Sequence, residues 1–158
     1  MRRIIMGAGA LALAAAVLTG ATATANEIGH EGCTPGYWKN HTDSWEEARP
    51  DSLFSNKFGT DGTSGYLVGL TFADALNGGG GPGVEGAEKI LARAATAAYL
   101  NAANEGLGYP WRRTSDGLDG RPPLVPTVRD AIDSGDRDTM LDLAARLDAD
   151  NNLGCPLS

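Results

Sequence analysis

Residues 32–41 have the sequence Gly-Cys-Thr-Pro-Gly-Tyr-Trp-Lys-Asn-His, and residues 151–157 have the sequence Asn-Asn-Leu-Gly-Cys-Pro-Leu. Cys33 and Cys155 are the two cysteines of this 158-residue chain, and each stands in a Gly-Cys pair with a proline close behind. In an oxidising compartment, such a pair is expected to form a disulfide. A Cys33–Cys155 bond would join the ends of one domain and stabilise it by about 5 kcal/mol in the chain-entropy model. The alternative is a reactive or metal-bound thiol pair.

The first 25 residues predict export. Two arginines follow Met1, residues 4–18 are an uncharged run rich in Ala and Leu, and residues 23–25 form a small-x-small sequence. This is the layout of a cleavable secretory signal peptide, and the apolar run is too short to span a bilayer. Cleavage after Ala25 would release residues 26–158 as a single disulfide-closed, secreted domain. The Arg2-Arg3 pair leaves both the general and the twin-arginine export routes open.

The charge of the predicted secreted domain limits its partners. Residues 26–158 hold 20 acidic and 11 basic side chains, which is a net charge of −9. An acidic protein repels a phosphate backbone and an anionic membrane surface. We therefore expect no nucleic-acid partner and no membrane insertion after signal cleavage. A chain of this length forms one domain with a modest core.

The fold class follows from three helical patterns. Residues 85–104 carry an Ala-rich apolar stripe, with polar residues that include Glu88 and Thr96 on the opposite side. Asn101 falls inside the stripe, so we expect its side chain to bond to a nearby loop. A helical hairpin is predicted near the C-terminus. Its first helix covers residues 127–132, and its second is capped by Asp136 and runs to about residue 148. The sequence thus predicts a mainly α, small irregular helical domain with an Ala-rich central helix, a C-terminal helical hairpin and one disulfide.

Shorter elements are predicted from caps and breakers. Residues 42–49 are expected to form one or two helical turns capped by Ser44 and stopped by Pro50, and residues 51–58 a further short turn. Residues 71–77 are predicted as a short helix that ends at Gly78 in the left-handed conformation. Residues 59–65, 77–83 and 107–126 are expected to be loops. The apolar run at 66–70 fits either a strand or buried coil.

The motif at 33–41 resembles the opening motif C-x-P-G-Y-W-K-N-H of a group of secreted bacterial proteins. The resemblance continues at 75–80 (Ala-Leu-Asn-Gly-Gly-Gly), 99–103 (Tyr-Leu-Asn-Ala-Ala) and 134–136 (Ser-Gly-Asp), and it closes with N-N-x-G-C-P-L at 151–157. It therefore covers nearly all of the chain that follows the signal peptide. The resemblance implies a bacterial, exported domain with these limits, and it implies no particular activity.

One acid–base cluster stands out. His41 is followed by Asp43, and Glu46 lies further along the predicted helical turns. A histidine oriented by a carboxylate can act as a general base, which makes a small secreted hydrolase one alternative function. The structural alternative is a surface histidine bonded to its own short helix. Because the chain has no Gly-x-Ser-x-Gly elbow and a disulfide-bonded cysteine is no nucleophile, we favour a protein that is not an enzyme.

Two further patterns point to ligands. Asp148, Asp150 and Asn152 are spaced like the first half of a calcium loop. We expect no cofactor, with calcium at these residues as the alternative. A polar cap leading into Cys155 is the structural alternative. Tyr109 and Trp111 lie in a stretch rich in Pro and Gly, where they could form an exposed platform for sugar rings or pack into the core.

These patterns favour one function over two others. The leading hypothesis is a secreted non-enzymatic module that binds a polysaccharide or protein of the cell envelope or extracellular matrix, or that has a structural role there. The alternatives are a small secreted hydrolase using His41 and a calcium-dependent extracellular module.

Overall fold

The computed structural model describes residues 30–60 and 65–157. The predicted signal peptide and residues 61–64 of one predicted loop lie outside this part of the chain. Within it, six α-helices and two short 3-10 helices form the fold, and no strand is present. The mainly α prediction is confirmed. The elements are α1 (Pro35–Asn40), η1 (Thr42–Ser44), α2 (Phe54–Phe58), α3 (Phe72–Asn77), α4 (Gly83–Ala103), η2 (Leu118–Gly120), α5 (Leu124–Asp133) and α6 (Arg137–Asn151).

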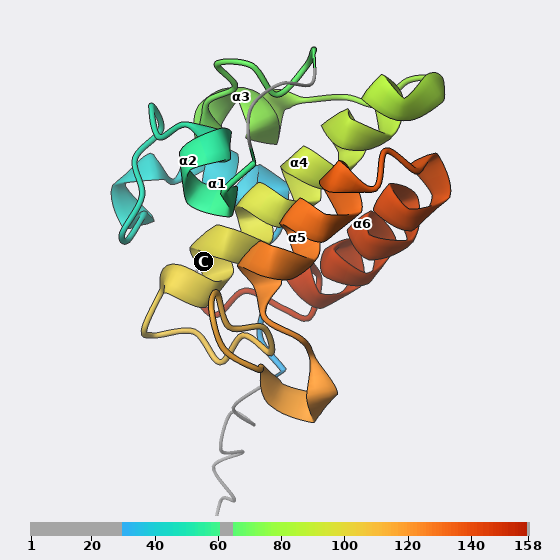
Figure 1. Cartoon of the computed structure of the whole chain (residues 1–158). Coiled ribbons are helices and arrows are strands. Elements are labelled where there is room, and N and C mark those ends of the chain that lie inside the picture. Colours follow the sequence, from blue (N-terminus) through green and yellow to red (C-terminus); the bar gives the residue numbers. More distant parts are fainter. Residues whose placement is uncertain (1–29, 61–64, 158) are drawn as a thin grey trace, which may run out of the picture.

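The Ala-rich helix α4 is the centre of the molecule, as predicted. Figure 1 shows it running through the middle, with α5 and α6 on one side and α1, α2 and α3 on the other. It packs most extensively against α6 and also contacts α1, α3 and α5. Glu88 and Thr96, which we expected to face solvent, are therefore 6% and 0% exposed. The prediction of a one-sided helix is wrong because neighbouring helices cover α4 on more than one side.

The C-terminal hairpin of α5 and α6 is confirmed. The side chain of Asp136 caps α6, with Oδ1 accepting from the Thr139 amide at 2.7 Å. Helix α6 extends to Asn151, three residues further than predicted. Helix α5 begins earlier than predicted, at Leu124, because Pro126 lies in its first turn, where the missing N–H costs no helical hydrogen bond.

The first helix lies earlier in the chain than the helix predicted over residues 42–49. Helix α1 occupies the opening motif itself, where Thr34 Oγ1 accepts from the Tyr37 amide at 3.1 Å and Pro35 takes the first helical position. The helix predicted over residues 42–49 is wrong, since only the single turn η1 forms there and Ser44 ends it rather than capping it. Thr34 and Pro35 supply the cap and first-turn signals of α1, whereas the Ser-x-x-Glu pattern at residue 44 begins no helix.

The glycine after α3 has a different role from the predicted one. The predicted helix forms as α3 with Thr71 as its cap, but Gly78 has φ −59°, which is not the left-handed conformation. A side chain would be crowded there, because a Cβ would lie 2.9 Å from Tyr66 Oη and 3.0 Å from the Ala75 carbonyl oxygen. Residues 66–70 form a turn rather than a strand.

No helix in the described part of the chain is long and apolar enough to cross a bilayer.

Candidate functional site

The two Gly-Cys stretches meet at a disulfide. Cys33 and Cys155 are bonded with their Cα atoms 4.5 Å apart, which confirms the predicted pairing. The Gly32 amide donates to the Gly154 carbonyl at 3.0 Å, so the two chain segments also pair through their main chains. A disulfide of this kind fits an oxidising, extracytoplasmic compartment.

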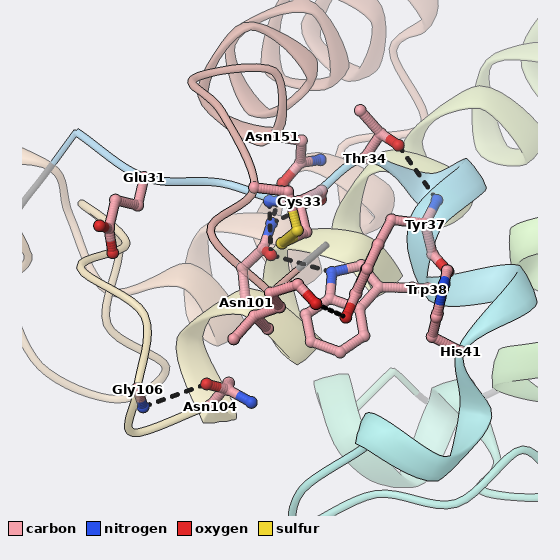
Figure 2. The surroundings of a disulfide bond; sticks show 12 residues. Glu31, Cys33, Thr34, Tyr37, Trp38, His41, Asn101, Asn104, Gly106 and Asn151 are labelled. Carbon is pink, nitrogen blue, oxygen red and sulfur yellow. Dashed lines mark hydrogen bonds between the residues drawn. A yellow bond between two sulfur atoms is a disulfide. The ribbon is translucent and has the colours of Figure 1, made fainter.

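The side chain of Asn101 in α4 forms hydrogen bonds to residues on both sides of this junction. Its Oδ1 accepts from the Cys33 amide and from Trp38 Nε1, and its Nδ2 donates to the Cys33 carbonyl and to Asn151 Oδ1, all at 2.9 Å. Figure 2 shows Cys33, Trp38, Asn101 and Asn151 gathered beside the disulfide. The expectation that Asn101 bonds a nearby loop is confirmed, and Asn151 is a partner that the sequence did not reveal. Cys33, Trp38, Asn101, Asn151 and Cys155 are hereafter named the clasp.

The expected sugar platform at Tyr109 and Trp111 is wrong. Both side chains are fully buried, and their polar edges bond inside the protein. Tyr109 Oη donates to Asn151 Oδ1 at 2.8 Å, and Trp111 Nε1 donates to Asp150 Oδ2 at 2.7 Å. Burial, together with the nearby Asp150 carboxylate, raises the pKa of Tyr109 well above its ordinary value, so the phenol remains a hydrogen-bond donor. These rings extend the clasp and present no face to solvent.

The predicted calcium loop is not formed. Asp148 and Asp150 belong to helix α6, where side chains two residues apart point to different sides. Both oxygens of Asp150 accept from Arg121 at 2.9 Å, so this carboxylate faces the buried interior while Asp148 and Asn152 are exposed. No group of three or more His, Cys, Asp or Glu side chains suited to a metal occurs among the described residues.

Asp150 is instead a charged anchor of the fold. Burial alone would raise the pKa of this carboxyl, but the hydrogen bonds from Arg121 and Trp111 outweigh burial and lower it below its ordinary value. The group is therefore an anion at neutral pH, and Arg121 neutralises it. The pair ties the irregular segment after α4 to the end of α6.

The residues of the predicted catalytic cluster do not come together. The exposed His41 ring stacks on Tyr37 with centroids 4.2 Å apart, and its Nδ1 lies 2.9 Å from the Tyr37 carbonyl oxygen. Glu46 accepts instead from the Asn104 side chain at 3.0 Å and from the Glu105 amide at 3.2 Å. Within residues 30–60 and 65–157, no hydrogen bond or ion pair joins His41 to Asp43 or Glu46. His41 is thus a surface histidine, but its ring lies against α1 rather than bonding to the short helix predicted after it.

An open groove lies on the surface of the described residues. Its volume is about 780 Å³, within the range of ligand-binding clefts, and it lies between the start of α1, the glycine-rich loop before α4, and helices α4 and α6. We name it the α4–α6 groove. Its lining residues are Thr34, Pro35, Gly36, Gly79, Gly80, Ile90, Arg93, Ala94, Leu141, Ala144, Ala145, Asp148 and Asn152.

The groove combines an apolar floor with one charge of each sign. Ile90 and Leu141 are only partly buried and supply apolar surface. Arg93 and Asp148 are exposed, and neither side chain forms an ion pair with another described residue. This site was not predicted from the sequence, although the spacing of residues 141, 144, 145, 148 and 152 places them on one face of α6. Such a face signals packing or binding equally well, which is why the pattern alone did not identify it.

Comparisons with protein-family models, with curated proteins and with solved structures gave no match. The fold and the site together describe a disulfide-closed, mainly helical domain with an open groove. The chemistry of that groove is the basis for assigning a role.

Proposed function

We propose that this protein is a secreted, non-enzymatic binding module of the bacterial cell envelope or extracellular matrix, and that its ligand lies in the α4–α6 groove. The observation that carries the proposal is the groove itself. It places the unpaired side chains of Arg93 and Asp148 above an apolar floor that is open to solvent. Ligand sites generally combine apolar surface with a few polar groups that orient the ligand.

The residue chemistry favours binding over hydrolysis. A hydrolase needs a nucleophile or an activated water held by a base, and the base in turn needs an orienting partner. His41 has no carboxylate partner among the described residues, and it does not line the groove. Asp148 lies in the groove without a histidine beside it. The buried side chains of Asn101 and Asn151 each form several hydrogen bonds, and these bonds stabilise the clasp.

The clasp supports binding by holding the groove in shape. Thr34, Pro35 and Gly36 directly follow the disulfide-bonded Cys33, and Asn152 directly follows Asn151, so two walls of the groove are continuous with the clasp. A preformed site loses less conformational entropy when a ligand binds. An exported domain outside the protection of the cytoplasm benefits from a covalent bond across its ends.

The test blocks the α4–α6 groove with a large side chain. Purified residues 26–158 with the disulfide intact would be incubated with bacterial envelope fractions, separated into polysaccharide and peptide or protein material, and the retained material quantified. Ala145→Trp places a large side chain in the groove, whereas Ala149→Trp makes the same change at another exposed position of α6 that does not line it.

We expect the native chain and Ala149→Trp to retain the same material and Ala145→Trp to lose it. Urea unfolding of each variant confirms that the fold is kept. Equal retention by Ala145→Trp and Ala149→Trp would show that the groove is not the binding site. If the native chain retained nothing, the binding role itself would be refuted.

A further inference from the structure

One wall of the α4–α6 groove consists of two glycines whose main-chain amides and carbonyls can bond to a ligand. Gly79 and Gly80 are exposed and have no side chains, and the amide and carbonyl of each form no hydrogen bond with another described residue. A Cβ at Gly79 would meet nothing within 4 Å, so another chain can approach the backbone closely there. Extended peptides are commonly recognised by free main-chain donors and acceptors of this kind.

The charges of the groove suit a ligand that carries both signs. Arg93 contributes the positive charge and Asp148 the negative charge, and no other charged side chain lines the groove. Their nitrogen and oxygen atoms lie beyond ion-pair distance, so each is free to meet a ligand group. The groove is therefore neutral overall, although the whole chain has a net charge of −7. A purely anionic or purely cationic ligand would leave one of the two side chains facing a like charge.

The floor of the groove favours a peptide over a sugar. Ile90, Leu141 and Ala144 give it an aliphatic surface, and no aromatic side chain of the described residues lines it. Sugar rings are bound well by aromatic faces, and the aromatic residues predicted for that purpose, Tyr109 and Trp111, are buried beside the clasp. Small aliphatic side chains and amides match this floor and the glycine wall.

We propose that the ligand of the α4–α6 groove is a short peptide with free ends. Its terminal carboxylate pairs with the Arg93 guanidinium, whose planar donors match a carboxylate, and its terminal ammonium pairs with Asp148. Amides of the peptide bond to the main chain of Gly79 and Gly80, which line the same groove. The inference rests on the proposed binding function and specifies the class of ligand for the same groove.

The test uses trialanine and its end-capped forms. Binding of trialanine, its N-acetylated form and its C-amidated form to residues 26–158 would be measured by calorimetry. We expect each cap to weaken binding about tenfold or more, since each removes one charge-assisted contact. Arg93→Gln should abolish the difference between the free and amidated peptides, and Asp148→Asn the difference between the free and acetylated peptides. Arg49→Gln and Asp142→Asn, at exposed positions outside the groove, should change neither difference.

This pattern separates ligand recognition from a general loss of structure, because each variant removes the effect of one cap and leaves the other. The proposal is overturned if trialanine does not bind, if the capped peptides bind as well as the free one, or if Ala145→Trp leaves trialanine binding unchanged. If Ala145→Trp still blocks retention of envelope material in the first two cases, the peptide inference fails and the binding function stands. If Ala145→Trp affects neither, both fail.

Discussion

Replacing Asn101 by alanine should cost more stability than any other single change of a polar side chain in this fold. The Asn101 side chain is fully buried and makes four hydrogen bonds of 2.9 Å. Its removal leaves the Cys33 amide, the Cys33 carbonyl and Trp38 Nε1 without these partners, whereas Asn151 Oδ1 keeps the bond from Tyr109. Each stranded buried group costs about 1–3 kcal/mol. Allowing for relaxation and water entry, we expect a loss of about 4 kcal/mol.

The assay is urea unfolding followed by tryptophan fluorescence, with the disulfide kept intact and the dependence on urea compared with that of the native chain. The matched control is Asn77→Ala, which removes an exposed asparagine whose side chain makes one local bond to the Ala73 carbonyl. That change should alter the free energy of unfolding by no more than about 0.5 kcal/mol. If Asn101→Ala cost less than about 1 kcal/mol, the clasp would not be the polar centre of the fold.

Three further predictions concern the same region. Reduction of the disulfide, or Cys155→Ala, should lower the free energy of unfolding by about 5 kcal/mol for a sequence separation of 122, and an unchanged urea midpoint would contradict this. Gly32→Ala should destabilise the fold by several kcal/mol, because its Cβ would lie 2.0 Å from the Asp150 carbonyl oxygen. The control is Gly36→Ala, whose Cβ would have its nearest neighbouring atom at 3.6 Å, and it should be neutral or stabilising by up to about 1 kcal/mol. Because the folded-state pKa of Asp150 is lowered, its contribution to the free energy of unfolding should be fully present above about pH 4 and fall as the pH drops through the folded pKa. This fall should be smaller in Asp150→Asn when urea unfolding is measured at several pH values.

The fold was largely predictable because its main signals are local. Alanine-rich periodicity identified α4, and the Asp136 cap and Gly135 identified the hairpin. One error also has a local cause. Ser44 offered a cap pattern that the chain does not use, and the first helix instead begins at Pro35, seven residues before the predicted start at residue 42.

The candidate site was much less predictable because it depends on partners distant in sequence. Tyr109 and Trp111 lie among prolines and glycines, which favours exposure, yet Asn151 and Asp150 supply their hydrogen-bond partners inside the protein. The spacing of Asp148 and Asp150 matches a calcium loop, but a helix turns the two carboxylates apart. The groove itself needs α1, the glycine-rich loop, α4 and α6 in one place, and no local pattern contains all four.

The sequence by itself determined the helical class, the hairpin, the pairing of Cys33 with Cys155 and the need of Asn101 for polar partners. These properties follow from periodicity, from caps within a few residues and from there being two cysteines. Only the tertiary structure decided that α4 would be buried on more than one side, that Tyr109 and Trp111 would pack beside the clasp, and that Arg93 and Asp148 would share a groove. The physical reason is that burial and unpaired charge are properties of packed surfaces, which arise when elements far apart in the chain meet.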